Sequence, residues 1–164
     1  MTFVVAEPDL HRQAAGRLLA AVRDRAPCAP VRDLIGSGDM AAGYAVQQLL
    51  TQEALASGRR ITDRKIGLTS EAVQRQLGVD QPDFGVLFAD MACTETEPID
   101  MAILLEPRIE AEVAFVLRGG LDRADLDLDV VRSAVDYAVA AHASCGRTPL
   151  NSSACDGGSL WLCG

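Results

Sequence analysis

The sequence predicts an α+β fold, and two observations lead to this class. Residues 1–58 place apolar side chains at the spacing of helices. From residue 59 onward, short apolar segments alternate with runs of Gly, Pro and Asp, as strands and turns do. A chain that begins with helices and continues with strands typically forms an α+β domain, and 164 residues are enough for one.

Two helices are expected in the first part of the chain. Residues 8–25 repeat Leu, Ala and Val at helical spacing, and prolines follow. Asp39 is a credible N-cap for a second helix that runs to about Ser57, where Gly58 suits a helix end. Residues 31–38, between the helices, are expected to be a connection.

The middle of the chain is expected to hold a strand and a short helix. The strand covers residues 59–69 and leads into a turn. Ser70 is expected to cap a helix over residues 71–77. Residues 78–85 are rich in Gly, Pro and Asp, which predicts a loop, and the brief apolar run 86–88 follows it.

Two strands and a helix are expected next. Residues 101–105 are a candidate strand, and residues 107–117 alternate in the manner of a longer one. A helix is expected to open at Asp127 or Asp129 and to run through about Ala141.

Glu110 and Glu112 lie in the strand predicted over residues 107–117. Residues two apart on a strand share a face, so these carboxylates stand together, with Cα atoms about 7 Å apart. Carboxylates that close repel unless a cation lies between them, and a hard cation such as Mg²⁺ takes oxygen ligands. A solvated acidic face is the alternative, because exposed like charges cost little in salty water. Ala114 and Val116 continue the glutamate face, which favours a buried pocket.

The composition excludes several classes of partner. The net charge is −8 and the pI is near 4.7, which argues against nucleic acid and against an anionic membrane surface. We find no apolar run of membrane-spanning length and no signal-peptide pattern, so a cytoplasmic protein is expected. The spacing of the five cysteines fits neither a zinc site nor a disulfide framework, which predicts free thiols.

The last segment differs in kind from the rest. From His142 onward the sequence is rich in small residues and cysteine and has neither helical nor strand periodicity. A genuine flexible tail is one interpretation, and a frameshift or premature end is the favoured one. The expected organisation is a helical region over residues 1–58, a β-rich region over 59–141, which the family resemblance given below identifies as a partial catalytic domain, and an aberrant tail over 142–164.

Three segments in order carry a resemblance to a known family. Residues 64–70 hold a Lys-Ile-Gly run, residues 76–85 end in Asp-Gln-Pro-Asp-Phe-Gly, and residues 107–115 hold the glutamate pair. From about residue 10 to 141 the chain resembles the 2-keto-4-pentenoate (2-hydroxypenta-2,4-dienoate) hydratases of the fumarylacetoacetate hydrolase superfamily. The resemblance implies N-terminal helices followed by the first part of that superfamily's mixed β domain, incomplete at the C-terminus.

The resemblance also implies a chemistry and a site. The family adds water to 2-hydroxypenta-2,4-dienoate, a small-molecule dienol, giving 4-hydroxy-2-oxopentanoate in the meta-cleavage degradation of aromatic compounds. It implies Lys65 and Asp83 as the catalytic acid/base pair, with Asp80 as a turn residue that competes for the role of Asp83. It implies Glu110 and Glu112 as ligands of Mg²⁺ or Mn²⁺, and a homo-oligomer when full length.

The chain departs from the family at one expected ligand. The family's third metal-binding glutamate falls at Ala143 in this sequence. We therefore expect an incomplete metal cage, and two alternatives to the hydratase stay open. One is 2-oxo-3-hexenedioate (4-oxalocrotonate) decarboxylase, a lyase of the same fold, and the other is an inactive fragment of either enzyme.

Overall fold

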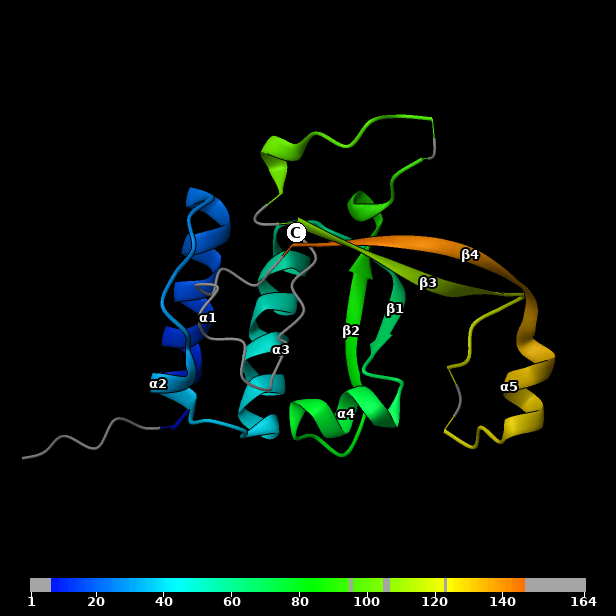
Figure 1. Ribbon diagram of the computed structural model, residues 1–164, viewed down its shortest axis with the longest axis horizontal. Helices are drawn as coiled ribbons and strands as arrows, with labels where there is room; N and C mark the ends of the chain where they lie inside the picture. Colours follow the sequence, from blue (N-terminus) through cyan, green and yellow to red (C-terminus); the bar gives the residue numbers. More distant parts are fainter. Residues whose placement is uncertain (1–6, 95, 105–106, 123, 147–164) are drawn as a thin grey trace, which may run out of the picture. The chain divides into compact units, whose positions relative to one another are not determined.

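In the computed structural model, the structure describes residues 7–146 apart from 95, 105, 106 and 123. The chain is a mixture of helices and strands, as predicted, and it divides into one compact unit up to Pro107 and a second over Arg108–Cys145. The elements in chain order are α1 (Glu7–Asp24), α2 (Arg32–Ile35), α3 (Met40–Ala56), β1 (Ile61–Gly67), α4 (Glu71–Leu77), β2 (Asp83–Phe88), β3 (Pro107–Leu117), α5 (Leu128–Ala134) and β4 (Val135–Gly146), with 3₁₀ turns at Ala89–Met91 and Met101–Ile103 (Figure 1).

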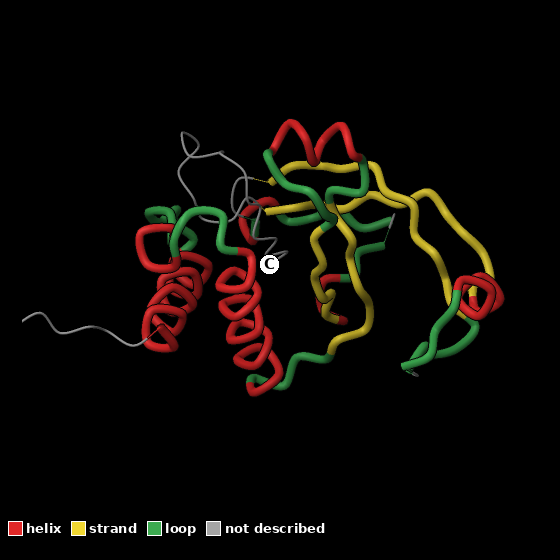
Figure 2. Tube along the Cα trace, turned by 90° about the horizontal axis from the view of Figure 1, so that it is seen from below, coloured by secondary structure: helices red, strands yellow, loops and turns green. Residues whose placement is uncertain are grey.

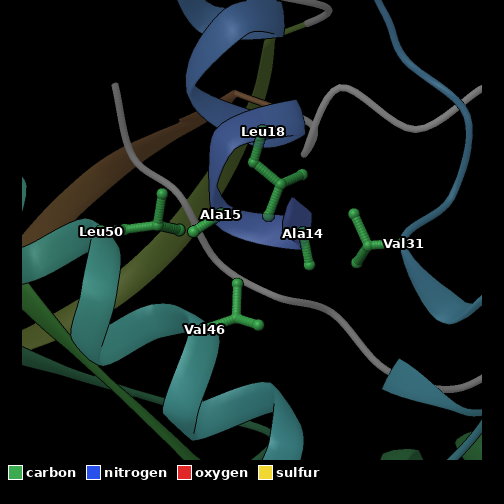
Figure 3. Close-up of a cluster of buried hydrophobic side chains, with 6 residues drawn as sticks. All are labelled: Ala14, Ala15, Leu18, Val31, Val46 and Leu50. Atoms are coloured by element: carbon green, nitrogen blue, oxygen red, sulfur yellow. The ribbon is translucent and has the colours of Figure 1, made fainter. Parts of the chain in front are cut away.

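The core of the first unit lies between α1 and α3. Both helices were predicted close to their observed bounds, because each carries one stripe of apolar residues that faces the other helix. Figure 3 shows these side chains pointing toward one another from the two helices and from the segment before α2. The buried cluster consists of Ala14, Ala15, Leu18, Val31, Val46 and Leu50.

The predicted cap of α3 is confirmed, but the connection before it contains an unpredicted helix. The side chain of Asp39 accepts a hydrogen bond from the backbone N–H of Ala42 at 2.9 Å. Within the expected connection, α2 forms four residues of helix. Such a short helix gains its stability from tertiary contacts. Here Arg17 supplies them, with two hydrogen bonds to the Asp33 carboxylate, at 2.7 and 3.0 Å, and a third to the carbonyl of Pro30.

β1 and β2 form an antiparallel two-stranded sheet (Figure 1, Figure 2). The register pairs Lys65 with Gly85 and Gly67 with Asp83. The prediction of a loop over residues 78–85 is therefore wrong for its last three residues, which open β2. Turn-type residues favoured a loop locally, but pairing with β1 satisfies their backbone groups and prevails.

α4 has the predicted bounds, although its expected cap works differently. Ser70 occupies the N-cap position, but its side chain makes no capping hydrogen bond. The tight turn before it is held instead by Gln74, whose Nε2 donates to the carbonyl of Leu68 at 2.6 Å. Leu68 has a φ of 54°, in the left-handed region that non-glycine residues seldom adopt.

In the second unit, the predicted glutamate strand is confirmed and the predicted helix is half wrong. β3 spans the predicted residues 107–117. The helix does begin after Asp127, which accepts a hydrogen bond from the N–H of Val130 at 2.7 Å, but it ends at Ala134. The rest of the expected helix is β4, which pairs with β3. Alternating Val and Tyr residues suit a strand, and that pairing overrides the helical propensity of the intervening alanines.

Two further predictions concern residues 101–105 and the segment after His142, both of which the structure describes only in part. The prediction of a strand over residues 101–105 is wrong for Met101–Ile103, which form a 3₁₀ turn. Asp100 caps this turn by accepting a hydrogen bond from the N–H of Ala102. Strand β4 continues past His142 to Gly146, and the rest of the predicted tail lies outside the described residues. The predicted domain limits at residues 58 and 141 stay predictions.

Candidate active site

Lys65 and Asp83 lie on the same face of the first sheet. Because Lys65 pairs with Gly85, two residues beyond Asp83, the two side chains are diagonal neighbours on adjacent strands. Both residues are half-buried, and both carboxylate oxygens of Asp83 are shielded from solvent. A carboxylate removed from water needs a compensating positive charge, and Lys65 is placed to supply it. The competing residue Asp80 is exposed, in a bend before β2.

Helix α3 fastens β2 at the residue after Asp83. The backbone N–H of Phe84 donates to Tyr44 Oη at 3.1 Å, and its carbonyl accepts from Gln47 Nε2 at 3.1 Å. The sequence reasoning missed Tyr44 and Gln47. Their signal was a pair of polar residues three apart on α3, outside the apolar stripe that the reasoning followed.

Glu110 and Glu112 share one face of β3, and this face is the more covered one. Burial alternates along the strand, with both glutamates half-buried. The opposite, apolar face is open, with exposed fractions of 78% for Ile109 and 64% for both Val113 and Phe115. The glutamate face is thus partly covered, and both interpretations of the pair, a metal site and a solvated acidic face, stay predictions.

The pairing of β3 with β4 decides which residue stands near the glutamates. The two strands run in opposite directions (Figure 1), and the N–H of Arg118 donates to the carbonyl of Ala134 at 2.9 Å. Residues joined in this way lie directly opposite in an antiparallel pair. Continued along both strands without a bulge, this register would set His142 opposite Glu110.

Continued in the same way, the register would bring Ala143 opposite Ile109, although the family resemblance gives Ala143 the position of the third metal ligand. Burial points the other way, because Ala143 is half-buried, like the two glutamates, whereas His142 is exposed. Among the described side chains, no group of three or more His, Cys, Asp or Glu residues is assembled to hold a metal. The structure thus offers two glutamates on one face, and it describes them in a different unit from Lys65 and Asp83.

Two further findings concern the helices and the cysteines of the described residues. No helix within the described ranges is long and apolar enough to cross a membrane. Cys28 and Cys93 are free thiols, as predicted, and burial raises the pKa of the Cys28 thiol. Neither cysteine belongs to a metal-binding group.

The fold over the matched part of the chain is shared with proteins of known structure. A solved structure of 4-oxalocrotonate decarboxylase from Pseudomonas putida G7, complexed with magnesium and adipate, superposes with a TM-score of 0.78. The match covers 92% of this chain and 57% of the decarboxylase at 24% identity, so it shows a shared fold. No protein-family model matches the chain.

Curated relatives give a more particular relationship. The "TodF product hydratase" of Pseudomonas putida F1 is 53% identical over 130 residues, which are 79% of this chain and 48% of the relative. The 2-keto-4-pentenoate hydratase of Paraburkholderia xenovorans LB400 is 45% identical over 134 residues, which are 82% of this chain and 50% of the relative. The chain is a homologue of these hydratases, and it spans about half the length of the curated relatives it matches.

Proposed function

We propose that this chain carries part of the active site of a hydro-lyase that adds water to 2-hydroxypenta-2,4-dienoate. The observation that carries the proposal is the Lys65–Asp83 arrangement, in which a solvent-shielded carboxylate and a lysine on adjacent strands share one face of the sheet. Homology to proteins named 2-keto-4-pentenoate hydratase supports this substrate class. The meta-cleavage degradation of aromatic compounds is the expected context, and the cytoplasm is the expected compartment.

The reaction needs a proton donor near the end of a conjugated chain. The enol O–H proton is lost as the terminal carbon gains one, which leaves an α,β-unsaturated ketone. Water then adds its oxygen to the β carbon, and a proton joins the α carbon, giving 4-hydroxy-2-oxopentanoate. Lys65 is proposed as the group that exchanges these protons, and Asp83 as the carboxylate that orients and charge-tunes it. Their placement on one face of the β1–β2 sheet suits a pair that shares a proton.

Glu110 and Glu112 are proposed as metal ligands. Two carboxylates on a half-covered strand face fit Mg²⁺ or Mn²⁺, which bind through one or two carboxylates and complete their shell with water or substrate. When bound, such a cation polarises the enol oxygen and lowers the cost of negative charge there. With two such ligands on the described face, we expect weak binding and little or no hydratase activity from this chain alone.

A decarboxylase is the second candidate, because a solved structure with this fold is that of 4-oxalocrotonate decarboxylase. An inactive fragment of either enzyme is the third. The protein is proposed to act as a homo-oligomer on a small-molecule dienol. The two reactions differ in one measurable product, because the decarboxylase releases CO₂ and the hydratase does not.

The test joins this chain to the unmatched portion of the Pseudomonas putida F1 relative and assays both the fusion and the 164-residue chain. We expect the fusion, with Mg²⁺ present, to consume the dienol, as measured by ultraviolet absorbance, without CO₂ release. Lys65→Met and Glu110→Gln should abolish this activity, whereas the exposed control Glu71→Gln should keep it. CO₂ release from 2-oxo-3-hexenedioate would favour the decarboxylase, and full activity of the unfused chain would contradict the expected deficiency.

A further inference from the structure

Two side chains of α3 bind the backbone N–H and C=O of Phe84. In an antiparallel pair, alternate residues direct their N–H and C=O groups away from the partner strand. On that outer side of β2, Tyr44 accepts from the N–H of Phe84 and Gln47 donates to its carbonyl, each at 3.1 Å. These distances are ordinary for hydrogen bonds. Two side chains thus occupy positions that a neighbouring strand would otherwise fill.

The helix that makes these bonds is itself anchored in the core. Ala42, Val46 and Leu50 form the buried stripe of α3 that packs toward α1. Tyr44 and Gln47 are three residues apart and therefore project together from another side of α3. The core consequently fixes the helix, and the helix fixes the strand.

The bonds act on the peptide that carries Asp83. The N–H that Tyr44 receives belongs to the peptide between Asp83 and Phe84, so this bond restrains the ψ angle of Asp83. Gln47 restrains the next peptide. Its amide also lies close to the face that bears Lys65 and Asp83, because a Cβ built on Gly85, which points to that face, would be 3.9 Å from Gln47 Nε2.

We propose that Tyr44 and Gln47 are positioning residues that hold the Asp83 carboxylate toward Lys65. This inference rests on the proposed acid/base role of the Lys65–Asp83 pair. Tyr44 has the larger effect, because it binds the peptide of Asp83 itself. We expect loss of its hydroxyl to let that peptide rotate, to weaken the proposed interaction of Asp83 with Lys65 and so to raise the pKa of the Asp83 carboxyl.

The test is a ¹³C NMR titration of the Asp83 carboxyl in the full 164-residue chain, with the signal assigned by its loss in Asp83→Asn. Lys65→Met sets the reference shift. We expect Tyr44→Phe to raise the titration midpoint in the same direction by about 0.5 pH unit, and Gln47→Leu by less. Gln48→Leu, at the exposed neighbouring position, is the matched control and should leave the midpoint unchanged.

A double variant separates positioning from general damage to the fold. In a Lys65→Met background, Tyr44→Phe should cause little further shift, because the contact through which it acts is already gone. Thermal unfolding of each variant reports loss of structure separately, and Gln47→Leu serves if Tyr44→Phe unfolds. A lowered Tm with an unmoved Asp83 midpoint in both variants overturns the positioning role. An Asp83 midpoint that ignores Lys65→Met instead contradicts the proposed acid/base pair itself.

Discussion

Lys65 lies diagonally across from Asp83 on one face of the β1–β2 sheet, and the carboxylate oxygens of Asp83 are shielded from solvent. Neighbouring charges of opposite sign on a covered face depend on each other. Removal of one partner leaves the other without compensation, whereas removal of both relieves the cost of burial. The pair therefore has a consequence for stability that is independent of catalysis.

We predict that Lys65→Met lowers the free energy of unfolding by about 1–3 kcal/mol, as expected when a shielded charge loses its partner. Adding Asp83→Asn should restore most of that loss. Urea denaturation of the two variants measures the difference. Arg64→Met is the matched control, because Arg64 is exposed on the other face of β1 and should change stability little. Equal losses for the single and double variants would mean that the two residues do not interact.

The helical core gives a second prediction. Leu18 of α1 is fully buried in the cluster that includes Val31 and the α3 residues Val46 and Leu50. Its neighbour Leu19 is 39% exposed. Leu18→Ala should lower the free energy of unfolding by about 2–5 kcal/mol, because it leaves a cavity as well as losing buried area. Leu19→Ala removes the same atoms from the edge of the core and should cost clearly less. Comparable denaturation midpoints for the two variants would show that this core is not packed as described.

A pH dependence follows from the Arg59–Asp90 ion pair. Hydrogen bonds of 2.8 and 3.0 Å from Arg59 hold the pKa of the Asp90 carboxyl below its usual value of 3.8. A lowered pKa in the folded state means that the pair stabilises the fold above pH 3.8 and that this contribution is lost as the pH falls further. The contribution is about 0.5 kcal/mol, discounted because Asp90 is largely exposed.

Asp90→Asn is the variant that tests this pH dependence. The substitution should reduce stability at pH 6 and have little effect at pH 2, so the two unfolding curves should converge on acidification. Asp63→Asn, at an exposed position of β1, provides the comparison. A constant difference between wild type and Asp90→Asn across this range would exclude the ion pair as its source.

The sequence predicted the elements whose local signals agree with their surroundings. The stripe through Val46 and Leu50 and the Asp39 cap both favour the helix that forms. Alternation over residues 107–117 likewise predicted β3 without error. The prediction of a helix over the segment that forms β4 was wrong, because the alanines of this segment favour a helix locally. Only pairing with β3 makes a strand preferable there.

The roles of the candidate site residues stay predictions, and their arrangement in space could not be predicted from the sequence. Motifs singled out Lys65, Asp83, Glu110 and Glu112 as candidates. They did not predict the hydrogen bonds from α3 side chains to the backbone of Phe84. Those bonds link residues 37 and 40 positions apart in the chain, and no local pattern encodes such a distance. The strand face on which Ala143 lies could not be predicted from the sequence either, because it depends on the register between β3 and β4.

The register of β3 and β4 supplies a final prediction. If His142 lies opposite Glu110, a carboxylate introduced by His142→Glu joins the glutamate face, whereas one introduced by Ala143→Glu falls on the apolar face. We expect His142→Glu to tighten Mn²⁺ binding, followed by electron paramagnetic resonance of the free ion, because it adds a third oxygen ligand. Ala143→Glu should leave the affinity unchanged, and Glu112→Gln should reduce it. The reverse order for positions 142 and 143 would show that the strands pair one residue out of this register, since a slip of one residue exchanges the two faces of a strand.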